Sequence, residues 1–75
     1  MQEIKQLFIN IERTDIDENM DNLVSEDIID SIDIMALVAE IEKLYKKPLK
    51  AEFIKPENFE SFENIKKMIN VAIKN

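Results

Sequence analysis

The sequence predicts one all-α domain, a four-helix bundle made of three main helices and one short helical turn. Apolar residues recur at helical spacing in three segments, over about residues 2–12, 31–46 and 61–73. The 75 residues are too few for two cores, so residues 1–75 form a single domain. The chain has no Gly, so any left-handed turn must use Asn, Asp or a strained residue.

The first helix is expected over residues 2–12. Ile4, Leu7, Phe8 and Ile11 recur there at i, i+3, i+4 and i+7. This spacing places all four side chains on one face, so the segment is an amphipathic helix with that face toward the core.

Residues 13–30 follow neither a helical nor a strand period and are rich in Asp and Asn, so a long loop is expected here. Apolar residues within it are candidates for anchoring the loop to the core: Ile16, Met20, Leu23, Ile28 and Ile29. Long ordered loops in compact domains are usually functional, so this segment is a candidate part of the site.

The second helix is expected over residues 31–46 and ends before Pro48. Its predicted core face is Ile34, Leu37, Val38, Ile41, Leu44 and Tyr45. A second apolar strip of Ile32, Met35 and Ala39 lies on another side, with Ser31 and Glu42. Two interpretations remain open: a helix buried on two sides, or a small exposed patch for a partner or ligand.

After Pro48 the chain becomes basic, and we expect one short helical turn within residues 50–60. Ser61 is the predicted N-cap of a last helix over 61–73. The helical spacing of this segment is carried by Phe62, Ile65, Met68, Ile69, Ala72 and Ile73.

The charge of the chain narrows the possible partners. Sixteen acids and ten bases give a net charge of −6, with −10 on residues 1–42 and +4 on residues 43–75. The negative total argues against binding nucleic acid or anionic lipid. The longest apolar run, residues 34–39, is far below the roughly 20 residues that span a bilayer, and no signal-peptide pattern begins the chain. We therefore expect a cytoplasmic protein without membrane insertion.

Missing residue types argue against catalysis by the chain itself. Without Cys there is no thiolate or disulfide, and without His the usual acid/base near neutral pH is absent. The sequence therefore predicts a protein that is not an enzyme and has no metal site.

The segment Asp30-Ser31-Ile32-Asp33 places a hydroxyl at the start of the second helix. Helix N-termini favour an attached phosphate, but capping of the helix is the more common role of Ser and Asp at this position, and Ser31 or Asp30 can serve as the cap alone. Ser31 has no His to activate it as a nucleophile, so any chemistry on its hydroxyl is expected to be done by another protein.

The stretch LVSEDIIDSIDIMALVAEIEKLYKKPL, residues 23–49, resembles the core of an acyl carrier protein. The later stretch IKPENFESFENIKKMI, residues 54–69, resembles the Pro-Glu-Asn-Phe turn and last helix of many carrier domains. With the first helix, the resemblance covers nearly the whole chain and implies an acyl-carrier-like four-helix bundle. One difference is that Ile28, preceded by Asp27, stands where carriers commonly have Gly.

The resemblance implies that Ser31 is the attachment point of 4′-phosphopantetheine, transferred from coenzyme A by a separate phosphopantetheinyl transferase. The arm would carry an acyl or aminoacyl group as a thioester between loading and accepting enzymes. The resemblance is compatible with partner enzymes of fatty-acid, polyketide, peptide or D-alanyl metabolism and does not choose among their acyl groups. A monomer is expected. The residues expected to meet partners are Asp30, Ile32, Asp33, Met35, Ala39 and Glu42.

Two other functions stay open at this stage. One is a helical interaction module without a prosthetic group, which would use the strip of Ile32, Met35 and Ala39. The other is weak calcium binding in the loop, where four oxygen-bearing residues fall at positions 1, 3, 5 and 12 of a calcium-loop pattern: Asp15, Asp17, Asn19 and Glu26.

Overall fold

The computed structural model of the protein describes residues 2–74, and this part of the chain is helical without strands. The three α-helices are α1 (Gln2–Asn10), α2 (Ser31–Tyr45) and α3 (Phe62–Ala72). Two short 3₁₀ helices, η1 (Ala51–Phe53) and η2 (Pro56–Phe59), lie between α2 and α3. The predicted all-α class and the three main helices are confirmed, each with an end one or two residues from the expected position.

The fourth helix of the predicted bundle is not present as such, because two 3₁₀ turns replace the single expected turn. Ile54 separates them with φ −89° and ψ 76°, outside the helical region. Lys55 is extended, with φ −134° and ψ 149°. A residue that precedes Pro is disfavoured in the α region, so Pro56 prevents η1 and η2 from joining.

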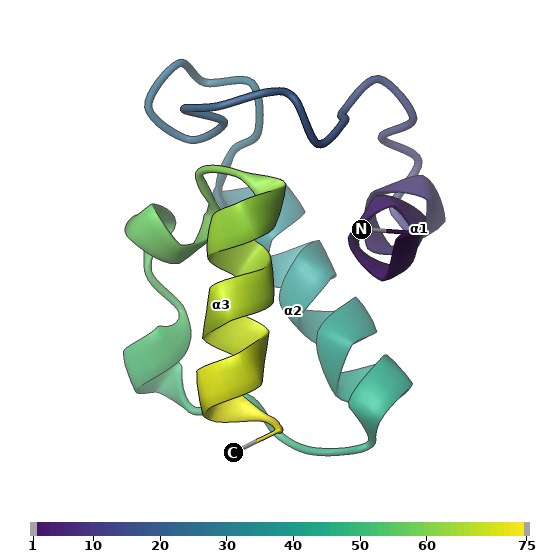
Figure 1. Ribbon diagram of the computed structural model, residues 1–75, viewed down its shortest axis with the longest axis vertical. Helices are drawn as coiled ribbons and strands as arrows, with labels where there is room; N and C mark the ends of the chain where they lie inside the picture. The colour runs from purple at the N-terminus through teal and green to yellow at the C-terminus, as the bar shows by residue number, and fades with distance from the viewer. Residues whose placement is uncertain (1, 75) are drawn as a thin grey trace.

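The three helices have different directions, and the long loop covers one end of the molecule (Figure 1). α2 and α3 both begin at the end that the 11–30 segment crosses, whereas α1 is seen nearly along its axis. α1 contacts both α2 and α3, and the rings of Phe8 and Phe62 stack with centroids 5.2 Å apart. This stacked pair joins the first and last helices in the core.

The core combines the apolar faces of all three helices with apolar residues of the connecting segments. The loop anchors Ile16, Leu23 and Ile29 are fully buried, and Met20 and Ile28 are partly buried against them. The long loop is therefore part of the core, as its apolar residues predicted. The other buried side chains are Ile4, Leu7, Phe8, Ile34, Leu37, Val38, Ile41, Leu49, Phe59, Phe62, Ile65, Met68, Ile69 and Ile73.

The prediction that Leu44 belongs to the core face of α2 is wrong. Leu44 is 51% exposed. It lines an open groove of about 520 Å³ between α1 and α2, together with Leu7 and Lys43. α1 does not cover this end of α2 completely, and helical spacing alone does not show where a neighbouring helix ends.

The expected left-handed turns are made without Gly. Among residues 2–74, positive φ occurs at Glu12, Asn22, Asp27 and Lys46. Asn22 and Asp27 belong to the residue types that tolerate this conformation, whereas Glu12 and Lys46 are strained there. Glu12 ends α1 two residues early, because Glu12 N–H donates to Ile9 C=O and Arg13 N–H donates to Phe8 C=O.

The length and polarity of the helices bear on membranes. Within residues 2–74, each helix is too short or too polar to cross a bilayer.

Replacing Lys46 by Gly is expected to stabilise the protein. Lys46 follows α2 with φ 56° and is exposed, so Lys46→Gly removes the steric cost of the left-handed conformation. The free energy of unfolding should rise by about 0.5–1 kcal/mol, measured by urea denaturation. Lys46→Ala keeps the Cβ and removes the same charge, so it serves as the control. Equal stability of the two variants would contradict the predicted strain.

Candidate functional site

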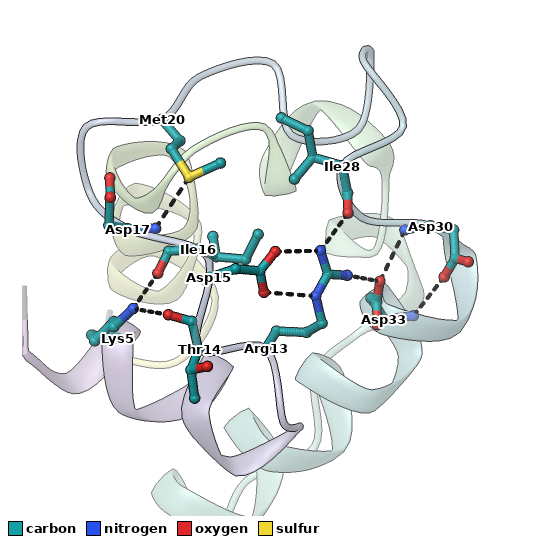
Figure 2. A network of polar contacts seen from close by, with 10 residues as sticks. All are labelled: Lys5, Arg13, Thr14, Asp15, Ile16, Asp17, Met20, Ile28, Asp30 and Asp33. Carbon is teal, nitrogen blue, oxygen red and sulfur yellow. Dashed lines mark hydrogen bonds and ion pairs between the residues drawn. The ribbon is translucent and has the colours of Figure 1, made fainter.

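The only arginine of the chain joins the start of the long loop to its end and to α2. Figure 2 shows the Arg13 guanidinium between the carboxylates of Asp15 and Asp33. Nη1 donates to Asp33 Oδ2 over 2.6 Å, and Nη2 donates to the Ile28 carbonyl over 2.7 Å. Nε and Nη2 bind both oxygens of Asp15, at 3.1 and 3.2 Å. Residues 15, 28 and 33 are thus held around the planar cation of Arg13.

The charges of this cluster support each other. The hydrogen bond from Arg13 lowers the pKa of the Asp15 carboxyl, and Asp15 with Asp33 raises the pKa of Arg13. The Arg13 side chain is 23% exposed and that of Asp33 is 20% exposed. The Arg13–Asp33 pair is therefore screened less by solvent than an ordinary surface ion pair.

Asp30 is the residue that caps α2. Its backbone is extended, and its Oδ1 accepts from Asp33 N–H over 3.1 Å. Asp33 Oδ2 in turn accepts from Asp30 N–H over 3.2 Å, which completes a capping box. The first helical hydrogen bond runs from Ile34 N–H to Asp30 C=O. Of the two predicted cap residues, the structure uses Asp30.

Ser31 is consequently the first residue inside α2 rather than its cap. The residue is exposed, and its hydroxyl makes no hydrogen bond to any residue from 2 to 74. The structure thus leaves this hydroxyl exposed at the N-terminal end of α2.

The second apolar strip of α2 is an exposed patch. Ile32 is 76% exposed and Met35 is 57% exposed, and Ala39 is exposed as well. The interpretation of a helix buried on two sides is therefore wrong. Ser31 and this strip together present an exposed hydroxyl next to an uncovered apolar surface.

Two acids predicted to meet partners form hydrogen bonds within the protein instead. Asp33 is half-buried under Arg13, as described above. Glu42 is half-buried, and its Oε2 accepts from Leu49 N–H over 2.7 Å, which holds the segment after Pro48 against α2. Asp30 is exposed, although Oδ1 is used in the capping box. Within residues 30–42, the predicted acidic surface is therefore smaller than the sequence indicated.

Glu60 fixes the middle of the loop, a role that the sequence analysis missed. Its Oε1 accepts from Val24 N–H and Ser25 N–H over 2.9 and 3.0 Å, and its Oε2 accepts from the Ser25 hydroxyl. The Glu60 carbonyl also accepts from Leu23 N–H over 2.9 Å. The Ser25 hydroxyl, followed by these backbone donors, lowers the pKa of Glu60 from its ordinary 4.5.

Arg13 was missed in the same way, although the sequence carried a signal for it. Residues 1–42 contain twelve acids and only Lys5 and Arg13 as bases. The two cations of such an acidic segment are therefore the side chains expected to bind acidic and carbonyl groups of the loop. Lys5 does hold the loop, because its Nζ donates to the carbonyls of Thr14 and Ile16 (Figure 2).

The calcium interpretation of the loop is not supported by its geometry. Asp15 is bound on both oxygens by Arg13, and Asp17 Oδ1 accepts from Asn19 N–H over 2.9 Å. Across residues 2–74, no three acidic side chains are gathered in a way that could hold a metal ion. The spacing of the four residues resembled a calcium loop, but the backbone does not wind them around a common centre.

Comparison of the chain with protein families, with curated proteins and with solved structures finds no match in any of the three.

Replacing Glu60 by Gln is expected to make the protein less stable at neutral pH but not at low pH. The folded-state pKa of Glu60 lies below the unfolded value, so its carboxylate stabilises the fold above about pH 4.5, and this contribution disappears as the pH falls further. The urea midpoints of wild type and Glu60→Gln should therefore differ at pH 7, and the difference should shrink as the pH falls below about 4.5.

The matched control for this change is Glu57→Gln. The Glu57 side chain is exposed and makes no hydrogen bond to residues 2–74. This variant should follow the wild type at both pH values. A midpoint difference for Glu60→Gln that does not change with pH would contradict the assigned role of the carboxylate.

Proposed function

We propose that the protein is a carrier protein that bears 4′-phosphopantetheine on Ser31. The observation that carries the proposal is the position of this residue. Ser31 is exposed at the first position of α2, and its hydroxyl is free of hydrogen bonds within residues 2–74 because Asp30 caps the helix. This arrangement fits a group attached by a phosphodiester bond, since the N-terminal end of a helix favours an attached phosphate.

In the proposed reaction, the chain contributes only the attacking oxygen. The Ser31 oxygen forms a bond to the phosphorus that carries the pantetheine half of coenzyme A, and the nucleotide half leaves with its own phosphates. The chain has no His to accept the hydroxyl proton, so a separate phosphopantetheinyl transferase supplies the base. The arm, when attached, supplies a thiol that holds an acyl or aminoacyl group as a thioester.

The surface next to Ser31 supports docking by the partner enzymes. Ile32, Met35 and Ala39 form an uncovered apolar strip on the same helix, and Asp30 adds an exposed acid. Exposed Lys43, Lys46 and Lys47 lie toward the opposite end of the helix. We infer that partners meet an apolar and weakly acidic surface at the start of α2, and a basic surface at its end.

The fold agrees with this proposal in its broad features. The long loop before α2, the three main helices and the short segment between α2 and α3 follow the order expected of a carrier domain. We interpret η1 and η2 as taking the place of the short helix of a four-helix carrier. Cargo choice is assigned to the loading and accepting enzymes, because the arm itself is the same for every acyl or aminoacyl group.

The proposal predicts one site of modification. Incubation with coenzyme A, Mg²⁺ and a broad-specificity phosphopantetheinyl transferase should add the mass of one arm, detected by intact-mass spectrometry. Ser31→Ala should abolish the gain, whereas Ser25→Ala should keep it, since Ser25 points to Glu60 in the loop. No gain with several competent transferases would remove the carrier proposal.

The proposal also predicts that the apolar strip acts in binding rather than in folding. Ile32→Ser and Met35→Ser should change the free energy of unfolding by less than about 0.5 kcal/mol, because both side chains are exposed. The same variants should lower kcat/KM of the transferase for this substrate. Val71→Ser is the control, because Val71 is 56% exposed on α3.

The second candidate function is an interaction module without an arm. The exposure of Ile32 is the observation that favours it. Under this alternative, Ser31→Ala would leave partner binding intact while Ile32→Ser would weaken it. A protein that is never modified but loses a partner with Ile32→Ser would support the module over the carrier.

A further inference from the structure

Two neighbouring residues compete to cap α2. Asp and Ser have nearly the same preference for the N-cap position, so the local sequence does not decide between Asp30 and Ser31. A shift of the helix start by one residue would make Ser31 the cap. Its hydroxyl would then accept from the N–H three residues later, at Ile34, and would no longer be free.

The capping box that selects Asp30 contains an electrostatic problem. Both of its side chains are carboxylates, and each one accepts from the backbone N–H of the other residue. Two anions three residues apart on a helix repel each other. Without a nearby cation, this repulsion would weaken the box and favour the neutral serine as the cap.

Arg13 supplies that cation from outside the helix. Asp33 Oδ2 accepts from Arg13 Nη1 over 2.6 Å and from Asp30 N–H over 3.2 Å, so one oxygen serves both the ion pair and the box. The same guanidinium holds the Ile28 carbonyl over 2.7 Å, two residues before the cap (Figure 2). Arg13 therefore fixes both the charge balance of the box and the path of the chain that enters it.

We propose that Arg13 is a positioning residue that makes Asp30 the cap of α2 and thereby keeps the Ser31 hydroxyl free. The choice of cap concerns the structure of the chain alone. Its consequence for arm attachment rests on the proposed function of Ser31.

The choice of cap is tested by NMR on Arg13→Gln. Gln keeps a side chain able to hydrogen-bond the loop but removes the positive charge. The ¹³Cα and ¹³Cβ chemical shifts of Ser31 should move from helical values toward those of an extended N-cap residue. The Asp33 amide, which donates to Asp30 Oδ1 in the wild type, should lose protection from hydrogen exchange. Asp15→Asn is the control, because it removes the charge of the other carboxylate paired with Arg13 and leaves both residues of the box unchanged.

A second variant separates the charge from the other contacts of Arg13. In Arg13→Gln combined with Asp33→Asn, the box keeps its acceptor at residue 33 but loses the repulsion. Ser31 should return to helical shifts. If it stays at extended values, Arg13 does not act through the charge of Asp33, and the proposal is overturned. Unchanged Ser31 shifts in folded Arg13→Gln would overturn it as well.

Arg13→Lys keeps the proposal open to test if Arg13→Gln does not fold. Lys retains the charge at Asp33 but lacks the planar group with five donors that binds both Asp15 oxygens and the Ile28 carbonyl in fixed geometry. Ser31 should therefore keep helical shifts in Arg13→Lys, even if the loop loosens. Extended Ser31 shifts in this variant would contradict selection of the cap by charge.

Arm attachment supplies the functional readout. Arg13→Gln should lower kcat/KM of the transferase about tenfold, which corresponds to about 1.4 kcal/mol. In the Asp33→Asn background, the same change should have little effect. An equal loss in both backgrounds would assign Arg13 a contact with the transferase instead. If the wild type is never modified, the carrier proposal fails, and the NMR result still decides which residue caps α2.

Discussion

The end of the molecule that carries Ser31 depends on the hydrogen bonds and ion pairs of Arg13. One guanidinium binds Asp15 at the start of the loop, the Ile28 carbonyl at its end and Asp33 in the first turn of α2. Four hydrogen bonds donated by one rigid, planar group fix the relative positions of these residues more narrowly than several separate lysines would. Because residues 13 and 33 are far apart in sequence, this cluster also sets how the loop enters the second helix.

The absence of Gly explains why charged side chains have this role. A loop without Gly has few residues that can turn sharply and still pair their own backbone groups. Here the backbone groups are satisfied by side chains from elsewhere: Lys5 binds the Thr14 and Ile16 carbonyls, and Glu60 binds Val24 and Ser25 N–H. Three buried apolar anchors then hold the loop on the core. These contacts order the loop together with its left-handed turns at Asn22 and Asp27.

The same contacts connect stability with the proposed function. Asp30 and Asp33 were expected to face partners, but the structure uses Asp33 mainly to close the capping box and to bind Arg13. This use leaves the Ser31 hydroxyl free beside the exposed Ile32 and Met35. An acid that looks like a docking residue in sequence thus contributes to the site indirectly, by setting where α2 begins.

The sequence by itself determined the three main helices, the Ser61 cap and the apolar anchors of the loop, because helical spacing and capping preferences are local properties. It also identified Ser31 and the strip of Ile32, Met35 and Ala39 as the candidate site. Only the tertiary structure decided that Leu44 is exposed, that Glu42 is occupied by Leu49 N–H, and that Asp30 rather than Ser31 caps α2. The exposure of Leu44 depends on which part of α2 the first helix covers, and Asp33 is held by Arg13, twenty residues away. These contacts join residues far apart in the chain, so helical spacing does not contain them. The capping box and the Glu42–Leu49 contact are closer in sequence, but the choice between two good cap residues and the path of the chain after Pro48 are visible only in the folded structure.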